Sequence, residues 1–111
     1  MKNFDGEFVS PSSTSVTDAA AGAVPFIQTH APDFRASITN APGNASYPIA
    51  SFIWLLMYEN PTDKKQNEVV MIDFLKWVLT DGQKVALKLG YAALPSDLVQ
   101  MELKQLGTST R

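Results

Sequence analysis

Anion binding is the first chemistry that the residue types suggest. Arg35 lies two positions after Asp33, and a guanidinium can bind two oxygens of one anion at once. Residues 12–15 (Ser-Ser-Thr-Ser) precede an alanine-rich stretch, and the free N–H groups of a helix start can also hold an anion. An ion pair is the simpler explanation of Arg35, and helix capping is the simpler explanation of the hydroxyls. We therefore expect no anion-binding side chain in this chain.

Catalytic and metal-binding patterns are weaker still. His30 is the sole histidine and there is no cysteine, so the usual soft-metal ligands and a cysteine nucleophile are missing. His30 also has no serine or carboxylate at the spacing of a catalytic triad. Residues 40–44 (Asn-Ala-Pro-Gly-Asn) lack the Gly-Lys-Ser/Thr ending of a phosphate-binding P-loop. We expect no enzyme activity, no catalytic residue, no metal site and no cofactor.

Three aromatic residues could in principle line a ligand cage: Trp54, Phe74 and Trp77. Aromatic side chains at helical or strand spacing usually belong to a hydrophobic core, where their large apolar surface contributes most to stability. We therefore expect all three to be core residues.

Composition and charge limit the class of protein. The chain has 111 residues, 45% of them hydrophobic, a formal net charge of -2 and a pI of about 5.2. Its basic residues are scattered, which argues against nucleic acid and against a basic membrane-binding patch. Residues 52–57 form the longest apolar run, far shorter than the roughly 20 residues of a membrane-spanning helix. Residues 1–10 contain no apolar core of a signal peptide, so we expect none here.

The elements that would position these residues are mainly helical. After a turn at residues 3–6, the pattern predicts a helix that begins near residues 12–15 and ends near Gly22. Residues 24–48 are rich in proline and predict loops, with a short extended piece at residues 34–38. A later helix is expected from Thr62 or Asp63 to Leu79.

The C-terminal part is expected to hold two more helices. Thr80 and Gln83 match a capping box that would begin a short helix ending near Leu89 and Gly90. Pro95 would open a last helix, because proline is tolerated at a first helical position.

Residues 49–58 differ from every other segment. They read Ile-Ala-Ser-Phe-Ile-Trp-Leu-Leu-Met-Tyr, without the alternation of a half-buried strand. Such a run predicts a strand that is buried on both faces. Hardly any other strand is available as a partner, and an unpaired buried backbone group costs about 1–3 kcal/mol. The pattern therefore indicates a piece of a larger α/β protein.

Five segments in order carry a family resemblance. They read Asp-Phe-Arg-Ala-Ser-Ile-Thr-Asn-Ala-Pro-Gly (33–43), Tyr-Pro-Ile-Ala-Ser-Phe-Ile-Trp-Leu-Leu (47–56), Asp-Phe-Leu-Lys-Trp (73–77), Asp-Gly-Gln-Lys (81–84) and Leu-Gly-Tyr-Ala-Ala-Leu-Pro (89–95). This order and spacing resemble the final third of the periplasmic phosphate-binding proteins of phosphate ABC transporters. The segment Gly-Glu-Phe-Val-Ser-Pro-Ser (6–12), followed by an alanine-rich helix, fits the same place.

The resemblance implies the C-terminal fragment of a two-lobed periplasmic-binding-protein fold, of α/β class, mostly helical with one apolar buried strand. By that resemblance residues 1–48 finish the second lobe, residues 48–51 form a hinge crossing, and residues 49–111 close the first lobe as part of one fragment. The family's phosphate ligands precede the matched region, and this sequence has no Ser-Gly-Thr triplet.

The resemblance also implies partners and a location. The chain would provide scaffold and hinge in a receptor that binds inorganic phosphate only together with the N-terminal part. That receptor would deliver phosphate to an ABC transporter permease and lie in the periplasm or at the cell surface.

Two other functions remain open on the sequence alone. A small stand-alone interaction domain could use the apolar strand and helix as a partner interface. Phosphatase activity has been linked with related phosphate-binding proteins, but no nucleophile–base pair is visible in this sequence.

Overall fold

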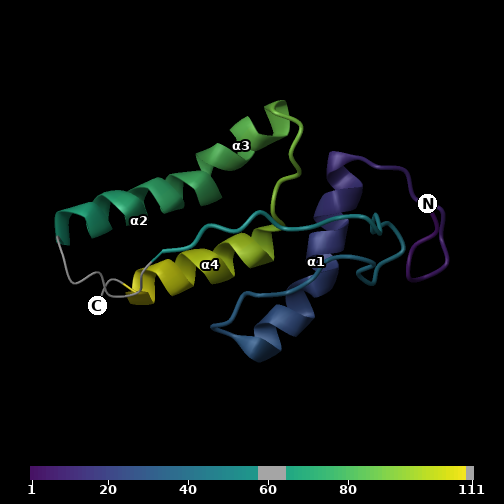
Figure 1. The fold of residues 1–111 in the computed structure, drawn as a ribbon, viewed down its shortest axis with the longest axis horizontal. Coiled ribbons are helices and arrows are strands. Elements are labelled where there is room, and N and C mark those ends of the chain that lie inside the picture. Colours follow the sequence, from purple (N-terminus) through teal and green to yellow (C-terminus); the bar gives the residue numbers. More distant parts are fainter. Residues whose placement is uncertain (58–64, 110–111) are drawn as a thin grey trace.

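Four helices make up the regular structure of the described residues. The computed structural model describes residues 1–57 and 65–109 (Figure 1). In these two ranges the helices are α1 (Ser13–His30), α2 (Lys65–Leu79), α3 (Asp81–Lys88) and α4 (Ser96–Ser109). The β-type backbone pairing in the described part of the chain is limited to a single antiparallel bridge between Lys2 and Phe8. The expectation of a mostly helical chain is therefore confirmed.

The start of α1 is fixed by a pair of serines. The Ser12 hydroxyl accepts a hydrogen bond from the Ser15 backbone N–H at 3.0 Å, and the Ser15 hydroxyl accepts one from the Ser12 N–H at 3.0 Å. This reciprocal arrangement satisfies two N–H groups that have no partner inside the helix. The prediction that the hydroxyls of residues 12–15 cap a helix is confirmed at Ser12 and Ser15.

The end of α1 differs from the prediction. The helix continues past Gly22 and through Pro25 to His30, although both residue types weaken a helix interior. Burial on one side outweighs this local preference, since Ala23 and Ile27 lie in the core. Gly22 has another role: a Cβ added there would collide with the carbonyl oxygen of Pro42. The glycine permits the loop to touch the helix and does not end it.

The hydrophobic core is built mainly on α1. Ile27 and Leu98 are 1% and 2% exposed, so α4 contributes to the same core as α1. The loop after α1 adds Ile38, and the members of the cluster are Ala19, Ala20, Ala23, Val24, Ile27, Ile38, Ala41 and Leu98. Phe34 and Phe52 pack against it from the loop segments. The core thus joins residues from both halves of the chain.

Helix α4 contacts both α1 and α2, and α3 follows directly after α2 (Figure 1). The predicted start of α2 at Thr62 or Asp63 lies outside the described residues, while its end at Leu79 is confirmed. Helix α3 ends at Lys88, close to the predicted Leu89, and α4 begins directly after Pro95. The predicted capping box at Thr80 is wrong, because the Thr80 hydroxyl donates backwards to the Lys76 carbonyl at 2.7 Å.

The side chain of Gln83 forms hydrogen bonds other than those of the predicted capping box. Its Nε2 donates to the Val78 carbonyl at 2.9 Å, and its Oε1 accepts from the Leu94 N–H at 2.8 Å. One amide therefore links the end of α2 to the connector that precedes α4. The bond between Gln83 and Leu94 spans 11 residues, and the side chain does not reach back to a helix cap.

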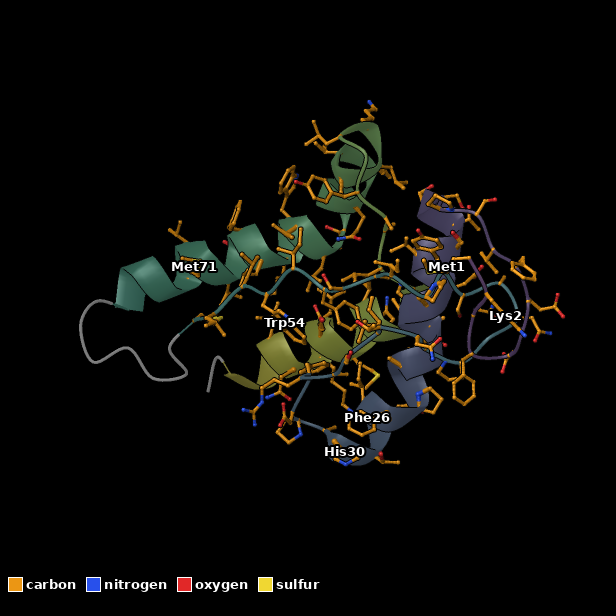
Figure 2. The ribbon with its side chains drawn as sticks, turned by 45° about the vertical axis from the view of Figure 1, so that its right-hand side comes forward. Met1, Lys2, Phe26, His30, Trp54 and Met71 are labelled. Atoms are coloured by element: carbon orange, nitrogen blue, oxygen red, sulfur yellow. The ribbon has the colours of Figure 1, made fainter. Side chains whose placement is uncertain are left out.

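Residues 49–57 do not form the predicted strand. This segment is drawn as a plain trace between α2 and α4 in both views (Figures 1 and 2) and carries no ladder contact. Leu56 is 95% exposed and Ile53 is 74% exposed, so burial on both faces is also absent in this chain. The physical reason is the one that the sequence raised: a strand needs a ladder partner, and no other strand exists in the described residues. The short extended piece expected at residues 34–38 likewise carries no strand assignment.

Candidate functional site

The side chain of Arg35 forms an ion pair with Asp33. Its Nη2 lies 2.8 Å from Oδ2 of Asp33, and its Nε donates to both carboxylate oxygens of Asp33, at 3.0 and 3.2 Å. The Arg35 backbone N–H donates to Asp33 as well, at 2.9 Å. These hydrogen bonds hold the pKa of Asp33 at about 2, and the same pair raises the pKa of Arg35. The forked donor that could have held an anion is used within an exposed ion pair, as the simpler sequence interpretation stated.

The other anion-binding candidate is also satisfied internally. The Ser15 hydroxyl donates to the Ser10 carbonyl at 2.9 Å while taking part in the cap, and Ser15 is 6% exposed. At the turn of residues 40–44, the Gly43 N–H donates to Oδ2 of Asp5 at 2.8 Å. A carboxylate of the chain itself therefore occupies the place where an external anion would approach this glycine.

His30 lies at the last turn of α1, stacked on Phe26 with ring centroids 4.0 Å apart (Figure 2). Its Nδ1 lies 2.8 Å from the Phe26 carbonyl and 2.9 Å from the Thr29 hydroxyl. No group of three or more His, Cys, Asp or Glu side chains in the described part of the chain is arranged to hold a metal ion. His30 is thus an exposed, locally bonded residue at the end of a helix, whereas the sequence predicted that it lies in a loop.

The most distinctive surface of the molecule is apolar. Helix α2 carries apolar side chains on two opposite sides, because positions 70, 74 and 77 lie about half a turn away from positions 72, 75 and 79. The second set includes the buried Ile72 and Leu79. Val70, Phe74 and Trp77 remain 68%, 51% and 46% exposed, and we call them the outer face of α2. The expectation that Phe74 and Trp77 are core residues is wrong for this chain.

The segment before α2 also exposes apolar side chains. Its exposed apolar residues are Ile49, Ile53, Trp54, Leu55, Leu56 and Met57. Trp54 is 46% exposed and makes an edge contact with Phe52, with ring centroids 5.5 Å apart. It is therefore not the core residue that the sequence predicted. Figure 2 shows Trp54 and Met71 on neighbouring elements.

Phe74 and Trp77 do not form a cage around a ligand. Their rings are stacked, with ring centroids 6.3 Å apart and an interplanar angle of 22°. The Trp77 ring also lies against Gly82, where an added Cβ would meet ring carbons at 3.3 and 3.4 Å. The two rings lie along the surface of the helix and enclose no space between them. Contact with another apolar surface is the chemistry that this arrangement offers.

Similarity to known proteins extends over almost the whole chain. The phosphate-binding protein PstS of Xylella fastidiosa (strain 9a5c) is 38% identical over 100 residues, which cover 90% of this chain and 26% of the relative. PstS of Methanocaldococcus jannaschii is 33% identical over 110 residues, covering 93% and 28%, and PstS of Haemophilus influenzae is 32% identical over 113 residues, covering 100% and 32%. The chain belongs to the PstS family. It corresponds to the C-terminal third of PstS, as the resemblance indicated.

The extent of the match matters as much as the identity. The chain spans between a quarter and a third of the length of these PstS relatives. No protein-family model matches the chain. The PstS relatives are named as phosphate-binding proteins. No helix in the described residues is both long enough and apolar enough to cross a membrane.

Sequence reasoning missed two features of the structure. It expected the outer face of α2 to be buried, because periodicity alone cannot tell which of two opposite apolar faces has a partner. It also treated Asn3 only as part of a turn, although the Asn3 side chain makes contacts some 40 residues away. Nothing in the spacing of the sequence signals these contacts.

Proposed function

We propose that this chain is the C-terminal portion of a phosphate receptor of an ABC-type import system, where it supplies scaffold and hinge and no phosphate ligand. The observation that carries the proposal is the exposed apolar surface of residues 49–57 and α2. Exposed apolar residues that gather on a surface commonly mark a site of contact with another protein surface. The PstS relatives are about three to four times as long as the matched region. A remainder of that size is sufficient to cover the surface.

The hydrogen bonds of the candidate anion-binding groups also support the proposal that this chain supplies no phosphate ligand. The Arg35 guanidinium is bonded to Asp33, and the Gly43 N–H is bonded to Asp5. Releasing either group for phosphate would require breaking a charge-assisted hydrogen bond, which is stronger than a neutral one. In this proposal the phosphate ligands come from the rest of the receptor.

The hinge is assigned to residues 48–51. The backbone is held until this point, since the Asn40 N–H donates to the Pro48 carbonyl at 2.8 Å and the Thr39 hydroxyl donates to the Ala50 carbonyl at 3.3 Å. Exposure begins within this stretch, at Ile49, and Ile53 beyond it is also exposed. In this proposal the hinge lies where the hydrogen-bonded loop leads into the exposed apolar segment. Residues 1–48 would then complete one lobe, and residues 49–111 would complete the other, with the apolar segment as a strand of the first-lobe sheet.

The proposal assigns partners to the whole receptor and not to this chain alone. Inorganic phosphate would bind in a cleft between the lobes, and the closed receptor would meet the transporter permease. The receptor would act in the periplasm or at the cell surface. A second candidate function, a small stand-alone interaction domain, is favoured by the same exposed apolar surface.

A chimaera separates the two candidates. The N-terminal part of the Xylella fastidiosa PstS, up to the matched region, is joined to this chain, and phosphate binding is measured by calorimetric titration. We expect the chimaera to bind phosphate within about tenfold of the intact relative, because the ligands lie outside the exchanged region and tenfold corresponds to about 1.4 kcal/mol.

The matched control carries Val70→Lys and Phe74→Lys on the outer face of α2. It should lose binding together with its cooperative unfolding, because the charges would have to be buried against the first lobe. A folded chimaera that does not bind phosphate would contradict the receptor proposal. A chain that is folded and monomeric by itself, combined with a chimaera indifferent to the two lysines, would favour the stand-alone domain.

A further inference from the structure

The side chain of Asn3 lies at the centre of a ring of carbonyl groups. Its Nδ2 is 3.1 Å from the Gly43 oxygen, 2.9 Å from the Asn44 oxygen and 3.2 Å from the Ser46 oxygen. Its Oδ1 accepts a hydrogen bond from the Glu7 N–H at 2.9 Å, which fixes the orientation of the amide. Asn3 is 6% exposed, although it is the third residue of the chain.

Three carbonyl oxygens that face one point repel each other unless a positive group lies between them. Oxygen cages of this kind are the usual ligand sets of hard cations in proteins. Here the partly positive NH₂ group of Asn3 takes that place, and it shares two hydrogens among three acceptors. A buried carbonyl without a donor is unfavourable, and the Asn3 amide donates to the carbonyl of the buried Ser46.

The ring belongs to a turn that is held from several sides. The Ser46 N–H donates to the Gly43 carbonyl at 3.0 Å, and Ser46 is fully buried. Gly43 has a φ of +126°, and a Cβ there would lie 2.6 Å from the Ser46 hydroxyl, so the turn requires glycine. The Tyr47 N–H donates to the Ser15 carbonyl at 3.0 Å, which ties the end of the turn to α1.

We propose that Asn3 is a positioning residue whose amide replaces a cation in the carbonyl ring of residues 43–46 and thereby fixes where the chain enters residues 48–51. The last part of this inference rests on the proposed function, which assigns the hinge to residues 48–51. Asn3 fixes the side of the turn that faces the N-terminal loop, and α1 fixes the other side. In this proposal the Asn3 side chain holds the N-terminal loop in a fixed position relative to the start of the hinge.

Hydrogen exchange of the full chain tests the anchor directly. We expect Asn3→Ala to lower the protection of the Ser46 and Tyr47 amides at least tenfold, while the amides of Ala23 and Ile27 in α1 keep theirs. The matched control is Asn44→Ala, since Asn44 is exposed and offers its carbonyl to the ring and not its side chain. Unchanged protection of Ser46 and Tyr47 in Asn3→Ala would overturn the proposal. Equal loss throughout α1 would also overturn it, because Asn3 would then be a general stability residue.

A second variant tests the electrostatic part. Asn3→Asp places a carboxyl group against three carbonyl oxygens, with Asp5 and Glu7 on the same loop and Lys2 and the terminal amine as the nearby cations. We expect the pKa of the new carboxyl, followed by NMR, to lie above the ordinary value of about 3.9. We also expect millimolar Ca²⁺ to restore the protection of Ser46 at neutral pH. An unshifted pKa with no effect of Ca²⁺ would show that the ring has no cation-like centre.

These measurements do not involve phosphate. A failed anchor would appear in the exchange data of this chain, whereas a failed receptor proposal would appear in the titration of the chimaera. The Asn3 proposal and the receptor proposal can therefore be refuted independently of each other.

Discussion

The Thr17 hydroxyl donates a 2.7 Å hydrogen bond to the carbonyl of Ala93, although 76 residues separate them in sequence. The bond joins the first half of α1 to the connector that precedes α4. It lies near the place where Leu98 of α4 enters the core built on α1. Alongside this apolar packing, the bond gives the two halves of the chain a specific polar link.

Replacing Thr17 by valine should weaken this junction. Valine keeps the shape of the side chain but removes the donor, so the Ala93 carbonyl loses its hydrogen bond. We expect a loss of about 1–3 kcal/mol in the free energy of unfolding, measured by urea denaturation. Thr17→Ser keeps the hydroxyl and should lose less. Coincident urea curves for Thr17→Val and the wild type would show that the bond contributes nothing to stability.

The ion pair of Asp33 and Arg35 should be visible in an NMR titration. The pKa of Asp33 is about 2, chiefly because of the side-chain hydrogen bonds with Arg35. Since this folded-state pKa is lower than that of an unfolded aspartate, the pair favours folding above about pH 4 and loses that effect as the pH falls towards 2. In Arg35→Ala the pKa of Asp33 should rise towards the ordinary value. A pKa near 4 in the wild type would contradict the pairing seen here.

The pKa of Glu102 on α4 is shifted in the direction opposite to that of Asp33, so its effect on stability should have the opposite pH dependence. Burial raises the pKa of this carboxyl, because a low-dielectric surrounding disfavours the charged form. The folded state therefore holds its proton more tightly than the unfolded state does. Stability from this group is complete below the unfolded pKa and is lost as the pH rises through the folded pKa.

Glu102→Gln removes this dependence, since glutamine stays neutral. The variant should unfold at a higher temperature than the wild type at neutral pH, and the difference should shrink below the ordinary glutamate pKa. A melting temperature difference that does not change with pH would argue against a raised pKa.

The exposed apolar residues should control association. Leu56 is 95% exposed, so Leu56→Lys should change the free energy of unfolding by less than about 0.5 kcal/mol. Because an exposed apolar surface favours self-association, the wild-type chain should form oligomers in light scattering, and Leu56→Lys together with Val70→Lys should form fewer. As a contrast, Ile27→Ala in the core should cost about 2–5 kcal/mol of stability. A wild-type chain that is monodisperse and monomeric would contradict this expectation.

Local signals in the sequence predicted several helix ends correctly. The serines of residues 12–15 mark the start of α1 because a cap is made between residues three apart. Pro95 marks the start of α4 for a similar reason, since its fixed backbone angle suits a first turn. Short-range chemistry is enough to specify such features.

Features that depend on distant partners were mispredicted or missed. Gly22 was interpreted as a helix end, but it is needed because Pro42 touches the helix there. Residues 49–57 have the composition of a buried strand, yet a strand forms only beside another strand. Gln83 was assigned to a cap, whereas it bonds to Leu94 in the next connector. Asn3 gave no signal, since its acceptors lie around residues 43–46. In each case the deciding atom lies far away in sequence.

The central claim is that this chain supplies scaffold and no phosphate ligand. Its most direct test is a calorimetric titration of the isolated chain with inorganic phosphate at neutral pH. The Arg35 guanidinium and the Gly43 N–H are already bonded within the chain, so we expect no saturable heat of binding. Saturable binding with a micromolar or tighter dissociation constant, abolished by Arg35→Ala, would show that the chain contains a phosphate ligand and would contradict the account.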